Sequence, residues 1–141
     1  RAVSIKNSSS LVIGADTIVS IKNRILGKPS NEKESFEMLK SLSGKTHTVF
    51  TGVSIQKKDE KIDLTFFDST NVTFKNLLDE EIGYYIKKYK PFDKAGSYGI
   101  QDWFSVCIKK IEGCYFNVVG LPLNKFYENF TKCINSGKFN S

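Results

Sequence analysis

Residues 11–17 read Leu11-Val12-Ile13-Gly14-Ala15-Asp16-Thr17, a short apolar run that ends in an acidic residue. Continuous apolar runs of this length are typical of strands that are buried on both faces of an α/β sheet. Open α/β sheets bind their ligands just beyond the carboxyl ends of such strands. We therefore predict an α/β fold in which Asp16 follows a buried strand and lies beside a ligand crevice.

Three segments carry helix signals. Asn31 and Glu34 have the spacing of a capping box, and the helix that follows should end at Gly44. A second helix is predicted over residues 77–89, and Pro122 suits the first turn of a last one. Apolar residues recur at helical spacing in the first and last helices: Phe36, Leu39 and Leu42, and then Leu123, Phe126, Tyr127, Phe130, Cys133 and Ile134. We expect the last stripe to contact either the core or a second copy of the chain.

The other segments carry strand signals. Residues 46–56 and 62–74 are rich in Val, Ile, Thr and Phe and flank the polar run 57–61, which predicts a long β-hairpin. Residues 18–21 either continue the first strand or form a second one, and residues 106–111 predict a further strand. No repeat or linker interrupts this order, and 141 residues fit one domain, 1–141.

Composition narrows the class of protein. The net charge is +6, but the lysines are dispersed among acidic residues, so we expect no stable nucleic-acid complex. Three cysteines without Cys-x-x-Cys spacing and a single histidine argue against a structural zinc site and against a disulfide framework, and favour a reducing cytoplasm. No apolar run approaches the roughly 20 residues of a membrane span, so no membrane association is expected.

Four polar residues have more than one interpretation each. Asp16 can hold a metal ion or deprotonate a water, or it can cap the following turn through Thr17. Lys28 lies in a Gly-Lys-Pro turn, where it either contacts phosphate oxygens or is simply solvated. Lys94 invites the same argument, and Asp93 can serve a metal, pair with Lys94 or cap a turn.

Gln101 is the candidate for base recognition. Its amide offers both a donor and an acceptor, which match the N3–H donor and O4 acceptor of uracil or thymine. In isolation it can equally be an ordinary surface glutamine. Tyr98 and Trp103 either stack on a base or belong to the core.

Several motifs, in this order, carry a family resemblance. They are Gly14-Ala15-Asp16-Thr17, Gly27-Lys28-Pro29, Thr51-Gly52-Val53, the loop 93–101 and the segment 113–123. Together they resemble the Maf family, nucleoside triphosphate pyrophosphatases that release pyrophosphate and a nucleoside monophosphate. The resemblance extends from the first residue to about Phe130. The loop that ends in Gln101 is similar to that of the branch acting on dTTP and UTP, although Asp102-Trp103-Phe104 stands where many members continue with glycine.

The resemblance implies a fold and roles for individual residues. The fold is a mixed central sheet flanked by helices, of the Maf/inosine-triphosphatase type. Asp16 corresponds to the family's proposed catalytic base. From the residues themselves, we expect Asp16 and Asp93 to be the ligands of a divalent cation, Mg²⁺ or Mn²⁺. Lys28 corresponds to part of the phosphate site, and we extend that role to Lys94. Thr17 and Gln101 would decide the choice of substrate, and the implied assembly is a homodimer.

The start of the chain departs from the family pattern. Maf proteins place a serine with paired arginines, and a glutamate and a lysine, ahead of the position where Arg1 stands. We expect a chain without this segment to be N-terminally truncated and catalytically impaired. A second hypothesis is therefore a catalytically weak Maf-like binding or regulatory protein, associated with septum formation. A third, a small basic nucleic-acid binder, is disfavoured because no basic motif interleaved with aromatic residues is present.

Overall fold

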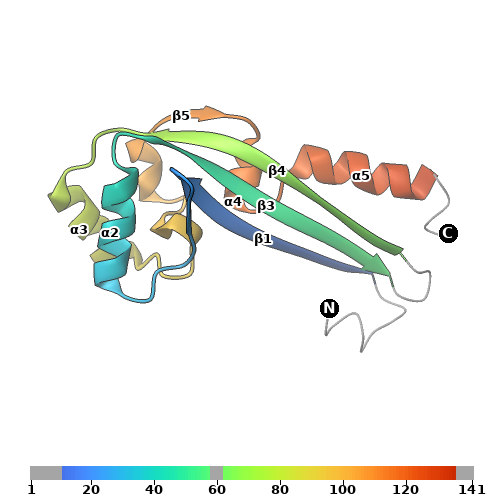
Figure 1. Cartoon of the computed structure of the whole chain (residues 1–141), viewed down its shortest axis with the longest axis horizontal. Helices are drawn as coiled ribbons and strands as arrows, with labels where there is room; N and C mark the ends of the chain where they lie inside the picture. Colours follow the sequence, from blue (N-terminus) through green and yellow to red (C-terminus); the bar gives the residue numbers. More distant parts are fainter. Residues whose placement is uncertain (1–10, 58–61, 136–141) are drawn as a thin grey trace.

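The computed structural model describes residues 11–57 and 62–135 of the chain, which form one five-stranded sheet with helices at one end and along one side (Figure 1). The strand order is β2-β1-β3-β4-β5. The strands are β1 (Val12–Ile21), β2 (Arg24–Leu26), β3 (Thr46–Lys57), β4 (Ile62–Phe74) and β5 (Ile108–Glu112). The helices are α2 (Glu32–Leu42), α3 (Asp79–Tyr89), α4 (Tyr115–Val119) and α5 (Leu123–Asn135).

Every strand pair among the described residues is antiparallel, which differs from the mixed sheet that we expected, while the α/β class is confirmed. A tight turn at Lys22 and Asn23 joins β1 to β2, and both residues have positive φ, 48° and 64°. Such turns match the twist of antiparallel hairpins. Because β2 reverses the chain before α2, β3 returns antiparallel to β1 on its other side. The turn has no glycine, so sequence patterns gave no hairpin signal there.

The long hairpin is confirmed. β3 and β4 pair from Thr46 with Thr73 to Lys57 with Ile62. The polar run expected to form the turn lies mostly outside the described residues. Residues 18–21 continue the first strand, since β1 is a single strand as far as Ile21.

The first two helices follow their local signals. The side chain of Asn31 accepts a hydrogen bond from the Glu34 backbone N–H at 2.9 Å, and Glu34 in turn accepts from the Ser30 backbone N–H. The helix ends at Leu42, and Gly44 follows with a φ of +66°. α3 starts two residues later than expected, at Asp79, with acidic residues in its first turn. Capping residues therefore predicted the bounds of α2 and α3 to within about two residues.

The core lies at the helix-covered end of the sheet. It is built from side chains of the strands, of α2 and α3 and of the loop after α3, including Val19, Leu39, Val49, Phe74, Tyr85, Ile100 and Phe104. The apolar run at 11–15 is not part of it. Ile13 is 46% exposed and Ala15 is also exposed, so the expectation of a strand buried on both faces is wrong for this half of β1. β2 pairs only with Val19–Ile21, and within the described residues the first half of β1 has β3 alone as its neighbour.

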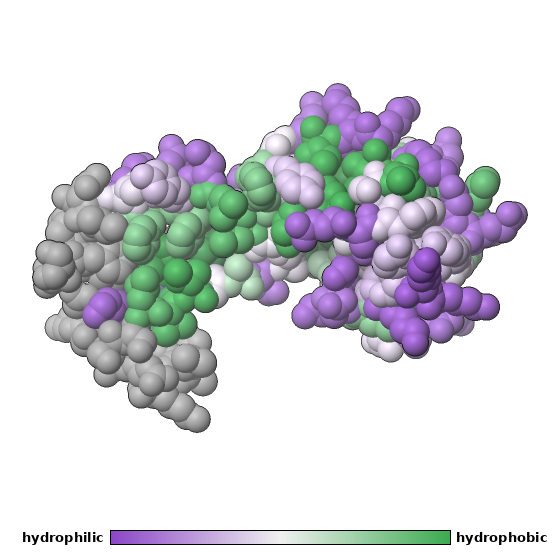
Figure 2. Space-filling view, turned by 180° about the vertical axis from the view of Figure 1, so that it is seen from behind, coloured by the Kyte–Doolittle hydropathy of each residue, from purple (hydrophilic) through white to green (hydrophobic). Residues whose placement is uncertain are grey.

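Two further expectations near the C-terminus are corrected. The strand predicted over residues 106–111 begins at Ile108, because Asp102 caps a short 3-10 helix, Trp103–Cys107, ahead of it. Within residues 123–130, the part of the α5 stripe whose side chains the structure describes, no residue belongs to the core, and Leu123 and Tyr127 are 45% and 67% exposed. Figure 2 shows apolar residues gathered in a hollow of the face seen from behind. No helix within the described ranges is long and apolar enough to cross a membrane.

Candidate functional site

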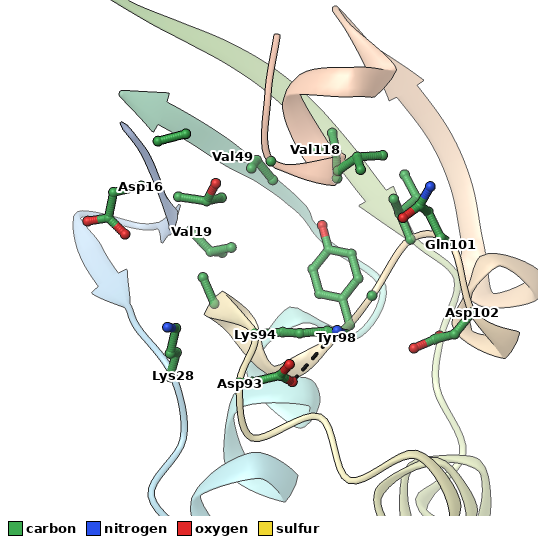
Figure 3. Close-up of a pocket in the computed structure, with 17 residues that line it drawn as sticks. Asp16, Val19, Lys28, Val49, Asp93, Lys94, Tyr98, Gln101, Asp102 and Val118 are labelled. Carbon is green, nitrogen blue, oxygen red and sulfur yellow. Dashed lines mark ion pairs between the residues drawn. The ribbon is translucent and has the colours of Figure 1, made fainter. Parts of the chain in front are cut away.

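A pocket of about 480 Å³ lies beside β1 and brings together segments that are far apart in the sequence. Its walls come from β1, the segment after β2, the loop 93–102 and α4 (Figure 3). Each of the six residues singled out in the sequence lines this pocket: Asp16, Thr17, Lys28, Asp93, Lys94 and Gln101. The pocket therefore contains two carboxylates, two lysines, a hydroxyl and an amide from this set.

Asp16 lies in the middle of β1, opposite Gly52 of β3, and not beyond the end of a strand as we expected. The expectation failed because β1 continues to Ile21. The residue nevertheless reaches the pocket, because this part of β1 has a neighbouring strand on only one side among the described residues. Its side chain is exposed and is available to a water or a ligand.

Thr17 begins a chain of hydrogen bonds that leads from the pocket into the protein. Its hydroxyl lies 2.9 Å from the hydroxyl of Thr51, which itself donates to the backbone carbonyl of Asn117 at 2.9 Å. A hydroxyl has one proton. Since Thr51 uses its proton on the carbonyl, Thr17 must donate to Thr51. Thr17 lines the pocket, and the lone pairs of its hydroxyl remain available as hydrogen-bond acceptors.

Asn117 of α4 holds this chain in place, and the sequence analysis did not single it out. Its side-chain amide is fully buried and donates to the backbone carbonyl of Val49 at 3.1 Å and to the hydroxyl of Thr70 at 2.8 Å. Thr70 in turn donates to the carbonyl of Cys114. These bonds fasten the short helix to β3 and β4. The signal was present, because Asn117 lies within the motif 113–123 used for the family resemblance.

The two lysines approach the pocket from different segments. Lys28 follows Gly27, whose carbonyl accepts a hydrogen bond from the backbone N–H of Gly96 at 3.0 Å. Lys94 forms an ion pair with Asp93 at 3.6 Å, so the pairing left open in the sequence is present. Both partners of that pair are substantially exposed, at 40% and 78%. Such pairs contribute little to stability, which leaves both side chains free to rearrange around a ligand.

Gly96 positions the loop against β1. Its φ is +70°, and a Cβ added there would lie 2.9 Å from a methyl group of Val19. Replacement by alanine should therefore lower the free energy of unfolding by about 1–3 kcal/mol, through backbone strain and overpacking. Denaturant unfolding measures this change. Gly83→Ala is the matched control, because a Cβ there meets nothing within 4 Å and the residue lies inside α3. Equal stability of Gly96→Ala and wild type would contradict the tight fit.

Tyr98 forms part of the pocket wall and is only 6% exposed. Its hydroxyl lies 2.8 Å from Nε2 of His47, whose Nδ1 has no hydrogen-bond partner among the described residues. Burial lowers the pKa of His47 to about 4, so the ring is neutral near pH 7. Trp103 does not line the pocket. It packs against the core and stacks on Tyr85, which places it on the core side of the two interpretations.

The polar groups of the pocket are separated along its length. Figure 3 shows Asp16 and Lys28 on one side and Gln101 on the opposite side, with Lys94 and Asp93 between them. The Gln101 side chain is exposed and belongs to a turn between Gly99 and Asp102. A ligand with a charged end and a planar polar end would match this distribution of groups.

The two carboxylates fit a metal ion that is bound partly by the substrate better than a metal ion that is bound by protein ligands alone. Within residues 11–57 and 62–135, no group of three or more Asp, Glu, His or Cys residues is placed to hold an ion. Magnesium commonly uses one or two carboxylates together with water and the phosphates of the substrate. Asp16 and Asp93 both line the pocket, and each carries a carboxylate of this kind.

Comparisons with known proteins identify the family of this chain. The family model described as Maf-like protein matches residues 1–133. A dTTP/UTP pyrophosphatase from Thermosipho africanus is 57% identical over 128 residues, covering 91% of this chain and 65% of that protein. A dTTP/UTP pyrophosphatase from a strain of Bacillus cereus is 55% identical over 124 residues, covering 88% of this chain and 64% of that protein. The chain thus spans slightly less than two thirds of these relatives.

The family match covers nearly the whole chain and includes every segment that contributes to the pocket. This chain belongs to the Maf family.

Proposed function

We propose that this chain carries the nucleotide site of a dTTP/UTP pyrophosphatase. The observation that supports this most is the convergence of six residues from three separate segments on one pocket. The names of the relatives add the substrate class. Reaction with water would convert the triphosphate to its monophosphate and pyrophosphate, with the bond between the α-phosphorus and the bridging oxygen broken.

The pocket residues would divide the work by position. Asp16 would orient the attacking water and take its proton. Lys28 and Lys94 would bind phosphate oxygens as point charges. Asp16 and Asp93 would hold Mg²⁺ or Mn²⁺, which would neutralise charge on the phosphates. Positioned charge of this kind supplies most of the acceleration in phosphoryl transfer, so no covalent nucleophile is needed.

Gln101 would read the base at the side of the pocket opposite Asp16, while Thr17, next to Asp16 on β1, would contribute an acceptor. The lone pairs of Thr17 would accept a hydrogen bond from an N–H or O–H group of the nucleotide or from a bound water. The amide of Gln101 can pair with the imide edge of uracil or thymine. Such polar pairing rejects a wrong base because a buried group is left without a partner.

The test is pyrophosphate release from UTP, dTTP, CTP and ATP, with Mg²⁺, with Mn²⁺ and after chelation. We expect release from UTP and dTTP that is lost on chelation and restored by added metal. Tight binding of UTP without release would support the alternative of a Maf-like binding protein. Equal release from all four nucleotides would contradict the assigned base preference.

Gln101→Ala should weaken turnover of UTP and dTTP more than turnover of CTP or ATP. The expected loss in kcat/KM corresponds to about 1–3 kcal/mol for a hydrogen-bonding group left unpaired. Asn124→Ala is a suitable control, because Asn124 is an exposed amide on α5 outside the pocket. A uniform loss across all bases would mean that Gln101 supports the loop without reading the base.

A cytoplasmic location and a homodimer also belong to the proposal. The thiols of Cys107 and Cys114 are free, which suits a reducing compartment. The exposed Leu123 and Tyr127 on α5 offer apolar area that a second copy could cover. Light scattering across a dilution series measures the assembly state.

A further inference from the structure

The turn that carries Gln101 is fastened from inside the protein by one hydroxyl group. Tyr85 of α3 is fully buried, yet its hydroxyl reaches both ends of this turn. We propose that Tyr85 is a positioning residue for base selection, which holds Gln101 in the orientation that reads the nucleotide. The proposal rests on the proposed function and assigns a role to a residue outside the pocket wall.

The hydrogen bonds close the turn on two sides. The Tyr85 hydroxyl accepts from the backbone N–H of Gly99 at 2.9 Å and donates to Oδ2 of Asp102 at 2.7 Å. The other oxygen of Asp102 accepts from the backbone N–H of Phe104 at 2.9 Å. Gln101 lies between Gly99 and Asp102, so its backbone is bracketed by groups bound to a single phenol oxygen.

The phenol itself has little freedom. The ring of Tyr85 stacks on Tyr89 with centroids 5.3 Å apart and on Trp103 at 6.1 Å, and it packs against Phe104 at 5.0 Å. Burial, and then the hydrogen bond to Asp102, raise the pKa of Tyr85 above its usual value. The hydroxyl therefore keeps its proton near pH 7 and remains a donor to Asp102 while it accepts from Gly99.

The turn also packs against Lys94, which lies between the two sides of the pocket. A Cβ added at Gly99 would lie 2.7 Å from Cε of Lys94 and 2.9 Å from Oδ2 of Asp102. On the inner side, Ile100 is only 6% exposed and anchors the turn in the core. Gln101 is the exposed member, and a long exposed side chain loses much rotamer entropy when it binds. A fixed backbone at Gln101 reduces the number of orientations that its side chain can adopt before the nucleotide binds, so less entropy is lost on binding.

Tyr85→Phe removes both hydrogen bonds and keeps the ring. Tyr84→Phe is the matched control on the same helix, because Tyr84 is 43% exposed and makes no contact with the turn's polar groups that the structure records. Circular dichroism checks that both variants fold. If Tyr85→Phe does not fold, Asp102→Ala removes the hydrogen bond between the Tyr85 hydroxyl and Asp102 from the other partner.

The first readout needs no activity. Amide hydrogen exchange at Gly99 should be at least about tenfold faster in Tyr85→Phe than in wild type, since about 1.4 kcal/mol of local protection is a factor of 10. Exchange in Tyr84→Phe should match wild type. Unchanged exchange at Gly99 in Tyr85→Phe would contradict the proposal that the Tyr85 hydroxyl holds this turn.

The second readout is base selectivity. The ratio of kcat/KM for UTP to that for CTP should fall about tenfold in Tyr85→Phe, and the double variant Tyr85→Phe/Gln101→Ala should select no worse than Gln101→Ala alone. A merely structural role would lower turnover of both nucleotides and leave their ratio unchanged. Additive losses in the double variant would also overturn the proposal.

Failure of the proposed function gives a different pattern. Isothermal titration calorimetry with UTP measures nucleotide binding without turnover. A wild-type chain that neither binds nor cleaves UTP would refute the function, and with it any role of Tyr85 in base selection. A wild-type chain that prefers UTP, beside a Tyr85→Phe variant with the same preference, would refute the role of Tyr85 alone.

Discussion

Asp16→Asn should reduce pyrophosphate release from UTP by about 10²–10⁴-fold, the usual worth of a general base. The amide has nearly the same shape as the carboxylate but can neither accept the proton of a water nor neutralise a cation. Because Asp16 is exposed on β1 and pairs through its backbone with Gly52, the substitution should leave the fold and the stability unchanged. Single-turnover kinetics would separate this chemical defect from weaker binding.

Glu37→Gln is the matched control for that experiment. Glu37 is exposed on α2, outside the pocket, and loses the same charge. If Asp16→Asn retains more than about a tenth of the wild-type rate with either metal, the assignment of Asp16 as the general base is wrong.

Lowering the pH from 7 to 4 should destabilise the folded chain through His47. The pKa of this buried ring falls from 6.5 to about 4, so below pH 6.5 the unfolded chain binds a proton that the folded chain resists. Stability is therefore fully present above pH 6.5 and is lost as the pH falls toward about 4. The difference corresponds to about 3 kcal/mol of the free energy of unfolding.

His47→Gln isolates this contribution. Glutamine can keep a hydrogen bond to Tyr98 but cannot ionise, so the variant should show a flatter dependence of stability on pH between 4 and 6.5. Urea unfolding at several pH values measures both chains. Glu81 also responds to pH, because its hydrogen bond from Lys75 lowers its pKa, but the wild-type chain and His47→Gln share this response. Parallel curves for the two chains would contradict the role of His47.

Local signals predicted most of the elements. The cap at Asn31, the glycine after α2 and the β-branched residues of the long hairpin each act over a few residues, and the structure follows them. The predictions failed where burial or chain direction depends on strands that are distant in the sequence. The run 11–15 is as apolar as a buried strand, but its burial depends on which strands lie beside it. The turn at Lys22 and Asn23 depends on positive φ at two residues without glycine.

The candidate site shows the same division. Asp16, Lys28 and Gln101 were singled out from short motifs, and all three line one pocket. Asn117 and Tyr85 were not singled out, because each acts through hydrogen-bond partners outside its own segment of the sequence. Asn117 bonds to groups on β3 and β4, and Tyr85 bonds to the loop after its own helix. An amide or a phenol carries no sign of such partners in its own neighbourhood.

Which chemical groups are present and where most helices and strands lie could be read from the sequence, because those properties depend on side-chain type and on contacts over a few residues. The directions of the hydrogen bonds in the site could not, because they depend on partners that only the folded chain brings together. Thr17 is left as an acceptor because Thr51 donates its own proton to the backbone carbonyl of Asn117, and the turn of Gln101 is held by the phenol of Tyr85 from α3. Each hydroxyl has one proton to donate, so its role is fixed only when all of its neighbours are in place.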